Sequence, residues 1–514
     1  MNILISVLSL SLIITHAYSL NILGIFPYEG KSHFMQFKVY LEELANRGHN
    51  VTVISYFPNK NPLPNYKDIT LGDGKILSDE AIASRSYITV IMTGVFLTKF
   101  GINNCRNLVS NEQVRDLVAR NHKFDVVVVE QFNSDCALGI AYKLGAPVVG
   151  ITSHILMPYH YQRLGIPSNP AYVPSHFLGG GSNPSLYQRV ERAVFDFYFR
   201  SLFIFEQWID GRSLAEYYDD IPPLEELARE IKFMLLYQNF ALTGSRLYPS
   251  NVIEIGGYHV SKAKPLTGDL KKFVEGAEQG VVYVSFGSML LISELPNKTQ
   301  EAIYEVANEF PQRFILKYGD KIPDLDKNKF YTGKWLPQID ILAHPKTLVF
   351  IGHGGMGSTV EGLHYGVPII VSPFFGDQPS NAAAIEESGF GVELEYIDKE
   401  PLRAALKRVL DPTFRAKALR VSQMWHDRPM SPLDTAVYWT EFAARHSNFT
   451  FRTPAADIPM YQHWNIDIAA VLIVIFLALA YVTKSVISIT CRRSQKGSNT
   501  IENKNKGKKR SKRE

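Results

Sequence analysis

The stretch that decides the fold of this chain runs over residues 335–381. It reads W-L-P-Q at 335–338, L-V-F-I-G-H-G-G-M-G-S-T-V-E at 348–361 and G-V-P-I-I-V-S-P-F-F-G-D-Q-P-S-N at 366–381. Residues 348–351 and 367–372 are short apolar runs, typical of buried strands in a parallel sheet. Glycines crowd the turn after the first run, where backbone can approach a ligand and the N–H groups that open a helix favour an anion.

Polar side chains in the same stretch complete a binding site. His353 follows the first strand, and Ser358 and Glu361 are three apart, so they share one face of the next helix. Asp377 and Gln378 lie just past the second strand. Because ligands of open α/β sheets bind at the carboxyl ends of strands, this edge offers phosphate donors and partners for hydroxyls. The pattern predicts a nucleotide-sugar site.

These motifs also resemble a known family. W-x-P-Q, H-G-G-x-x-S-x-x-E, G-V-P and D-Q, in this order, resemble the signature of the UDP-glycosyltransferases, and A-V-Y-W-T-E-F at 436–442 resembles the insect branch. The resemblance implies an α/β fold of the GT-B architecture, with two Rossmann-like β/α/β domains facing across a cleft. It implies acceptor binding in the first domain and UDP-sugar binding in the second.

The resemblance also implies roles for single residues of the second half. Trp335 would stack on uracil, and the backbone of Gln338 would pair with it. Phosphate contacts would come from Ser288, His353, Gly355 and Ser358, the ribose contact from Glu361, and sugar hydroxyl contacts from Asp377 and Gln378. One departure is Gly357, where many relatives place asparagine.

His33 is the candidate catalytic base. A first strand is expected at 20–27 and a helix at 34–47, so His33 lies at the first turn of the helix, beyond the end of a strand. The helix dipole disfavours an imidazolium there and keeps the ring able to accept a proton. The S-H-F sequence at 32–34 resembles the family's catalytic histidine.

A base of this kind needs a carboxylate on its other ring nitrogen. A strand is expected at 124–130, and two carboxylates follow: Glu130 at its end and Asp135 at the start of the next helix. The family uses an aspartate in this region, so we assign Asp135, with Glu130 as the rival. The alternative role for Asp135 is to cap its helix.

Both ends of the chain carry sorting signals. Residues 2–16 are apolar and A-Y-S precedes Leu20, which predicts a signal peptide over 1–19. Residues 467–491 are predicted to span a membrane, and the tail 492–514 carries ten Lys and Arg against two Glu. This basic flank predicts a single-pass type I protein with its body in the lumen, and R-S-K-R-E at the end resembles an endoplasmic-reticulum retrieval signal. The basic balance belongs to the tail, so no nucleic-acid partner is implied.

We divide the remaining chain at changes of composition. The predicted acceptor domain covers 20–250, a linker 251–268, the UDP-sugar domain 269–440, and a return helix with the juxtamembrane segment 441–466. Glycosylation sequons occur at Asn50, Asn297 and Asn448. Whether Cys105 and Cys136 form a disulfide stays open, as does the oligomeric state.

The first half does not name its acceptor. Residues 158–187 are rich in Pro, Gly, Ser and Tyr, which predicts loops over a pocket. Seven of the fourteen residues in 195–208 are aromatic, and we expect a helix packed into the domain core. A wall of the acceptor pocket and a membrane-facing surface remain alternatives.

The predicted reaction is transfer of a hexose to a hydroxyl of a small lipophilic acceptor, such as a phenol, pigment, steroid or xenobiotic, with inversion at the anomeric carbon. The D-Q pair resembles that of the glucose-using members of the family, which implies UDP-glucose as the donor, with UDP-glucuronate as the alternative. No metal or other cofactor is expected, because Asp324-Leu-Asp326 lies in a polar loop without a strand to deliver it. A lumenal carrier of lipophilic compounds, without catalysis, is the hypothesis from another class.

Overall fold

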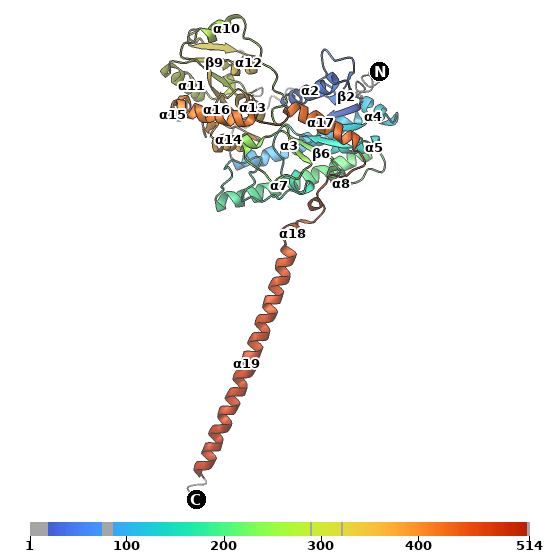
Figure 1. Ribbon diagram of the computed structural model, residues 1–514, viewed down its shortest axis with the longest axis vertical. Helices are drawn as coiled ribbons and strands as arrows, with labels where there is room; N and C mark the ends of the chain where they lie inside the picture. The colour runs from blue at the N-terminus through green and yellow to red at the C-terminus, as the bar shows by residue number, and fades with distance from the viewer. Residues whose placement is uncertain (1–18, 74–85, 288–289, 320–321, 511–514) are drawn as a thin grey trace, which may run out of the picture. The chain divides into compact units, whose positions relative to one another are not determined.

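The computed structural model describes residues 19–73, 86–287, 290–319 and 322–510. The chain divides into two compact units, residues 1–456 and 457–514. The first unit contains two parallel β-sheets with helices against them (Figure 1), and the second contains C-terminal helices. Three predicted features lie outside the described residues, namely the signal peptide up to residue 18, Ser288, and residues 511–514 of the retrieval signal.

The first sheet has seven parallel strands. Their order in space is β3-β2-β1-β4-β5-β6-β7. The strands are β1 (Asn21–Phe26), β2 (Asn50–Ser55), β3 (Tyr66–Thr70), β4 (Val126–Glu130), β5 (Val148–Ile151), β6 (Phe233–Leu236) and β7 (Val252–Glu254). The last strand falls within the segment predicted as a linker, so this sheet takes up more of the chain than its composition indicated.

The second sheet has six parallel strands in the order β10-β9-β8-β11-β12-β13. They are β8 (Val281–Ser285), β9 (Arg313–Lys317), β10 (Phe330–Gly333), β11 (Thr347–Gly352), β12 (Ile369–Val371) and β13 (Gly391–Glu393). The strands predicted on each side of the glycine-rich turn are β11 and β12, and they pair in parallel.

Burial on both faces explains the near-continuous apolar strands. In β4, Val126 and Val128 belong to one hydrophobic cluster, and Val127 and Val129 belong to another on the opposite face. A strand that is covered on both sides has no place for the alternation of apolar and polar residues seen in half-exposed sheets. The first cluster continues into the second sheet and includes Tyr283 and Phe350.

Helices connect the strands and cover both sheets. In the first half they are α2 (Lys31–Asn46), α3 (Tyr87–Ser110), α4 (Glu112–Ala119), α5 (Cys136–Leu144), α6 (His160–Arg163), α7 (Leu186–Ala215), α8 (Leu224–Arg229) and α9 (Phe240–Thr243). In the second half they are α10 (Gly268–Glu275), α11 (Asn297–Glu309), α12 (Gln338–Leu342), α13 (Met356–His364), α14 (Gln378–Glu387), α15 (Lys399–Leu410), α16 (Pro412–His426) and α17 (Pro432–Arg445). Short 3₁₀ turns occur at Ile292–Glu294 and Pro454–Ala456.

Each sheet has one point at which the strand order reverses. In the first sheet this point lies between β1 and β4, and in the second between β8 and β11. Loops that leave neighbouring strands at such a point diverge to opposite faces and leave a crevice at the carboxyl ends. The helices that follow β1 and β11 carry His33 and the glycine-rich signature, so the topology places both candidate motifs at reversal points.

The chain returns to the first sheet through α17. Its contacts there include a hydrogen bond of 2.6 Å between the hydroxyls of Tyr40 and Thr440 and a ring contact of 4.7 Å between Phe233 and Trp439. Arg47, the residue that follows α2, also binds Asp434 on α17. The return helix was predicted within residues 441–466, and in the structure it begins at Pro432.

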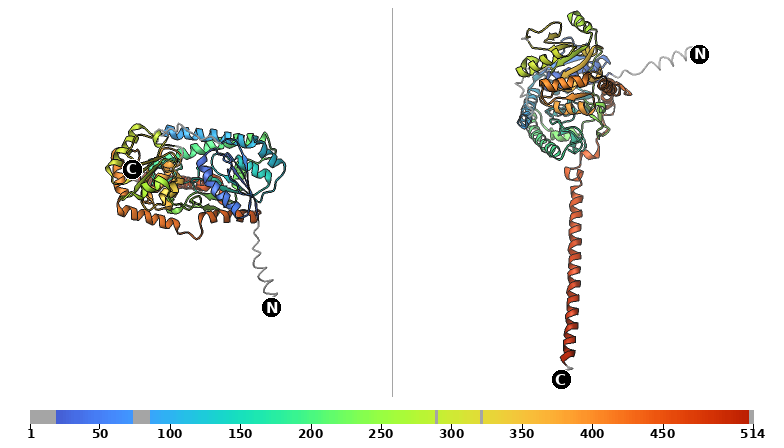
Figure 2. Two further views of the ribbon diagram at one scale, coloured as in Figure 1. Left: turned by 90° about the horizontal axis from the view of Figure 1, so that it is seen from above. Right: turned by 90° about the vertical axis from the view of Figure 1, so that its left-hand side faces the viewer.

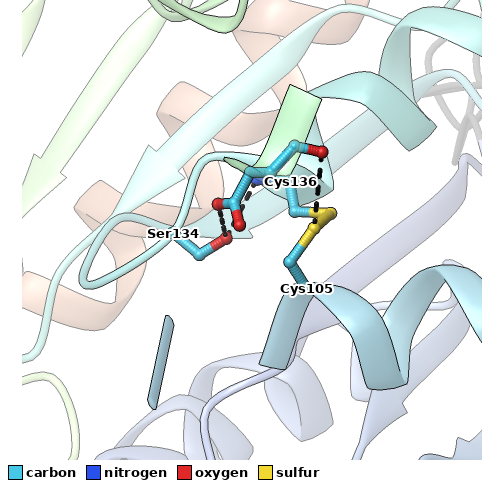
Figure 3. Close-up of a disulfide and its surroundings, with 4 residues drawn as sticks. Cys105, Ser134 and Cys136 are labelled. Carbon is cyan, nitrogen blue, oxygen red and sulfur yellow. Dashed lines mark hydrogen bonds between the residues drawn. A yellow bond between two sulfur atoms is a disulfide. The ribbon is translucent and has the colours of Figure 1, made fainter. Parts of the chain in front are cut away.

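Cys105 and Cys136 form a disulfide (Figure 3). It joins α3 to the first residue of α5, with the two Cα atoms 5.4 Å apart. Ser134 lies beside it and accepts a hydrogen bond of 3.1 Å from the Cys136 N–H while donating one of 2.7 Å to Asp210. The bridge therefore holds the loop that follows β4.

Helix α7 divides the aromatic segment 195–208 between two environments. Phe195, Phe199 and Phe203 are buried and pack in a cluster with Phe132, as the prediction of a core helix requires. Phe197, Phe205 and Trp208 lie on the opposite face and are exposed. The prediction of a core helix is right for one face of α7 and wrong for the other.

The second unit contains α18 (Met460–His463) and α19 (Ile466–Arg510). The most apolar window within residues 466–493 of α19 has a mean hydropathy of 2.6, and none of that window is buried. This apolar helix fits a transmembrane helix, in agreement with the predicted span at 467–491. It continues through the basic residues that follow.

Candidate active site

His33 and Glu130 form a pair at the carboxyl edge of the first sheet. His33 belongs to the first turn of α2, which begins soon after β1 ends, and Glu130 is the last residue of β4. Because β1 and β4 are neighbours, their ends bring the two side chains together. The His33 Nδ1 and the Glu130 Oε1 are 2.8 Å apart.

The predicted pairing of His33 with Asp135 is therefore corrected in favour of Glu130. Asp135 is buried and accepts hydrogen bonds of 2.9 Å from Arg163 and 2.7 Å from Gln207. Arg163 also binds Glu225 at 2.7 Å. Asp135 sits at the start of α5 but makes no side-chain bond to the helix backbone, so it neither caps the helix nor orients His33.

The reason lies in the length of the loop after β4. Five residues, 131–135, separate the strand end from α5, and they carry Asp135 away from the strand edge to the buried Arg163. Strand order is the signal that distinguishes the two carboxylates. A residue that ends a strand next to β1 must lie close to the start of the helix after β1.

Burial governs the electrostatics of the pair. It lowers the pKa of His33 to about 4, while the Asp377 carboxylate acts in the opposite direction. Burial also raises the pKa of Glu130 to about 8. At neutral pH the imidazole is therefore uncharged, which is the state that can accept a proton.

Aromatic rings that the sequence did not single out surround His33. The ring centroids of Tyr28 and Phe132 lie 4.8 Å from that of His33, and the centroid of His154 lies 5.8 Å away. Phe132 connects this site to the buried aromatic cluster under α7. These residues come from three loops, so spacing along the chain gives no sign of their proximity.

The turn between β11 and α13 forms the corresponding edge of the second sheet. Gly354 has a φ of +83°, a left-handed conformation that favours glycine. A Cβ added to Gly355 would overlap the His353 ring, so the present position of that ring leaves room only for glycine at residue 355. Among the described residues no side chain caps α13, which leaves the N–H groups of its first turn directed at the turn.

Lys317 adds a cation that was not predicted. It lies at the end of β9, donates a hydrogen bond of 2.6 Å to the Gly287 carbonyl, and has its Nζ 4.9 Å from the centre of the Trp335 ring. Burial, together with the charge of Lys317, lowers the pKa of His353 to about 4. A helix N-terminus, a neutral imidazole and an ammonium group therefore converge, an arrangement suited to an anion.

Gln338 links two of the predicted motifs through its side chain. Its Nε2 donates hydrogen bonds of 3.1 Å to Ser358 and 2.6 Å to Glu361, and its Oε1 accepts one of 3.1 Å from Tyr283. His259 contacts the second oxygen of Glu361 at 3.3 Å. The W-x-P-Q segment is thus held against the same helix face that carries Ser358 and Glu361.

The remaining residues predicted to bind the UDP-sugar differ in exposure and in the hydrogen bonds that they already make. Trp335 is 74% exposed, so one face of its ring is open to a planar partner. Asp377 accepts a hydrogen bond of 2.8 Å from Asn381. Gln378 is buried, and its Oε1 accepts hydrogen bonds from the N–H groups of Phe374 and Phe375 at 2.8 and 3.2 Å. Within the Gln378 side chain, the amide nitrogen is therefore the atom left to bind a ligand.

The two sheet edges face each other within the first unit. The charge of Asp377, from the second half, acts on His33, from the first. A Cβ added to Gly357 would lie 3.1 Å from the Gln36 Nε2, so the starts of α13 and α2 are in contact. The Lys31 Nζ lies 5.9 Å from the Trp335 ring centre. The predicted base and the predicted anion site therefore form one site.

Within the described ranges no group of three or more His, Cys, Asp and Glu residues is arranged to hold a metal ion. Asp324 and Asp326 are exposed in the loop before β10, where Asp326 accepts a hydrogen bond of 2.9 Å from the Asn328 N–H.

Comparisons with known proteins agree with this geometry. The family model described as "UDP-glucoronosyl and UDP-glucosyl transferase" matches residues 76–500. UDP-glucosyltransferase 2 of Dactylopius coccus is 33% identical over 92% of this chain and 94% of its own length. UDP-glucuronosyltransferase 2A3 of Cavia porcellus is 30% identical over 89% of this chain and 90% of its own.

Solved structures show the fold. A glycosyltransferase of kitacinnamycin superposes with a TM-score of 0.57 and 18% identity, over 83% of this chain and 99% of its own. A UDP-glucosyltransferase from Polygonum tinctorium gives a TM-score of 0.55 at 16% identity, over 84% of this chain and 99% of its own. Both agree with two parallel sheets in a GT-B arrangement. The chain therefore belongs to the UDP-glucuronosyl and UDP-glucosyl transferase family and is a UDP-glycosyltransferase.

Proposed function

We propose that this enzyme transfers glucose from UDP-glucose to a hydroxyl of a small lipophilic acceptor, with inversion at the anomeric carbon. The observation that carries the proposal is the contact of 2.8 Å between His33 and Glu130, set opposite Asp377 and the β11–α13 turn. A buried, neutral imidazole beside a carboxylate is the arrangement that general base catalysis needs.

In the proposed reaction the His33 Nε2 takes the proton of the acceptor hydroxyl. The acceptor oxygen forms a bond to the anomeric carbon as the bond from that carbon to the β-phosphate oxygen breaks, and UDP leaves with the bonding electrons. Attack on the face opposite the departing UDP converts an α-linked donor into a β-linked product. Glu130 is a positioning residue, which holds the Nδ1 and stabilises the imidazolium formed.

The second half would bind the donor. The N–H groups that open α13, with His353, Gly355 and Ser358, would hold the diphosphate, and Lys317 would offset its growing charge. Glu361 would accept hydrogen bonds from the ribose hydroxyls, and Asp377 with the Gln378 amide would bind the sugar. Trp335 would stack on the uracil ring. No metal is needed in this scheme.

Two observations support the choice of substrates. The similar Dactylopius coccus protein is named a UDP-glucosyltransferase, whereas UDP-glucuronate is the donor suggested by the name of the Cavia porcellus relative. The aromatic cluster that reaches His33 through Phe132 favours a lipophilic acceptor. UDP release with each donor and a panel of phenols distinguishes the two sugars.

We propose further that the catalytic unit lies in the lumen of the endoplasmic reticulum, anchored by α19. The disulfide between Cys105 and Cys136 fits an oxidising compartment, and the sequons Asn50, Asn297 and Asn448 are exposed. Glycosidase-sensitive mass and protection of the catalytic unit from protease in sealed microsomes are the expected results.

His33→Ala tests the proposed chemistry. Transfer should fall to background while UDP binding, measured by calorimetry, stays unchanged. His122→Ala, at an exposed histidine remote from Glu130, is the matched control. If UDP-sugar is bound but the wild-type chain turns over no acceptor in the panel, a carrier of lipophilic compounds becomes the better description.

A further inference from the structure

Helices α3 and α7 present a continuous apolar surface on the outside of the first half. The two helices lie side by side (Figure 2). We call this surface the α3–α7 face, and its exposed members are Ile88, Ile91, Met92 and Val95 from α3 and Leu186, Tyr187, Val190, Val194, Phe197, Ile204, Phe205 and Trp208 from α7.

Close packing fixes the two helices to each other. A Cβ added to Gly94 would lie 2.7 Å from the Tyr198 ring, and one added to Gly101 would overlap Glu206. The Tyr198 hydroxyl donates a hydrogen bond of 2.7 Å to the Ile91 carbonyl. Residues further along α3 therefore contact residues further along α7, so the two helices run in the same direction. The outward-facing residues form one surface rather than two separate stripes.

The charges on these helices are distributed unevenly. The exposed charged side chains within the two helices, both fully described, are Lys99, Arg106, Arg189 and Arg212, and all are basic. Helix α3 has no acidic residue, and of the four acids of α7, Glu206 and Asp210 are buried while Glu191 and Asp196 are half-buried. Between Val190 and Trp208, the exposed positions of α7 carry no charge.

Such a surface is unusual for a helix in water. A solvent-facing helix normally carries charges on its outer side, and large exposed apolar patches mark interaction sites. An apolar face with aromatic residues and a basic margin is typical of helices that lie in the headgroup region of a bilayer. At the end of the face, the Arg212 guanidinium lies 3.8 Å from the centre of the Trp208 ring.

The connection to α19 makes a bilayer the favoured partner. Ala456 ends the first unit, and a Cβ added to Gly165 would lie 2.8 Å from its nitrogen. Gly165 follows α6, whose Gln162 is bound by Arg200 of α7. Residues 457–465 separate Ala456 from α19, a reach of at most about 30 Å of extended chain.

We propose that the α3–α7 face docks on the surface of the lipid bilayer, with its apolar side chains at the headgroup boundary and its basic margin against anionic headgroups. This inference rests on the proposed anchoring by α19. Docking would bring lipid close to the inner side of α7, where Phe195, Phe199 and Phe203 belong to the aromatic cluster that reaches the catalytic histidine.

The test releases the catalytic unit from its anchor after the full chain has been inserted. A site for a specific protease is placed within residues 457–465, and the protein is reconstituted into vesicles of phosphatidylcholine and phosphatidylserine. After cleavage, flotation measures the share of the catalytic unit that stays with the vesicles. The variant Ile88→Glu/Phe197→Glu is compared with Tyr396→Glu/Leu419→Glu, which places the same charges on exposed apolar residues of the second half.

The cleaved wild type and the control should remain largely bound, and the α3–α7 variant should partition at least about tenfold less. Transfer in detergent and the melting temperature should match wild type, which shows that the variant is folded. Full release of the cleaved wild type at physiological salt would overturn the inference. Retention through a second copy, seen as a dimer in detergent that the variant abolishes, would overturn it too. If the uncut chain itself is washed off with carbonate, the proposed anchoring fails instead.

Discussion

The proposed active site has a donor half and an acceptor half, and the two are assembled from the chain in different ways. The donor half collects Gln338, Ser358 and Glu361 within 24 residues, and their hydrogen bonds join neighbouring parts of one motif. The acceptor half joins His33 to Glu130 across a separation of 97 residues. A motif that is local in sequence fixes its own geometry, whereas a site between distant segments depends on which strands are neighbours.

The largest effect is expected when the carboxylate of the His33–Glu130 pair is removed, which tests whether the two halves act independently. Glu130→Gln keeps the shape of the side chain but cannot stabilise an imidazolium, so kcat should fall by about 10²–10⁴-fold. Affinity for UDP, made by the other half, should not change. Steady-state kinetics and calorimetry of UDP binding measure the two effects. An equal loss of UDP affinity would mean that Glu130 supports the donor half as well.

Asp135→Asn tests the rival carboxylate. It would leave the fully buried Arg163 with less compensation, so the free energy of unfolding should fall by about 3 kcal/mol. At a temperature where the variant is folded, kcat should stay within a few-fold of wild type. Asp326→Asn, at an exposed aspartate, is the control for stability. A thousandfold loss of kcat without a change in melting temperature would restore Asp135 as the partner of the base.

The pH dependence of kcat/KM also tests the assignment of Glu130 as the partner of His33. Burial raises the pKa of Glu130 to about 8, and an ionised Glu130 is the form that stabilises the charged imidazole. As pH falls below about 8, Glu130 takes up a proton, and kcat/KM should decline by up to about tenfold per pH unit. In Glu130→Gln this limb should disappear. An unchanged limb in the variant would assign the titration to another group.

A smaller effect is expected in the donor half. Lys317→Met removes one of several groups around the diphosphate site, so KM for the UDP-sugar should rise about five- to tenfold with little change in kcat. Lys329→Met is the matched control, because Lys329 donates to the Gln312 carbonyl at 2.7 Å and lies on a different strand connection. A larger fall in kcat than in affinity would give Lys317 a role in the transition state.

The sequence was sufficient to predict β1 and β4, which lead to His33 and Glu130, and the strands β11 and β12 on each side of the glycine-rich turn. The apolar runs before His33 and after the W-x-P-Q motif are buried on both faces, so their composition is distinctive. The partner of His33 was mistaken, because a family pattern favoured an aspartate and the order of β1 and β4 is not visible in the chain. Lys317 was missed because a single lysine at a strand end has no signature.

Other differences follow from physical causes of the same kind. β3 combines buried and more exposed residues and β13 has three residues, so neither carries the continuous apolar run of the buried strands. Helix α7 is aromatic on both faces, so aromatic content alone indicated burial for all of it. The return through α17 began earlier than expected, because Pro432 at its first turn starts the helix rather than ending the one before.

The return of α17 has a consequence for engineering new acceptor preferences. Since Thr440, Trp439 and Asp434 are part of the first half, that half is discontinuous in the gene. A chimera that exchanges only residues 20–250 between two relatives would pair a foreign α2 with the original α17 and create a mismatched seam. Recombination that carries residues 20–254, which include β7, together with residues 432–456 would transplant the whole of the proposed acceptor module.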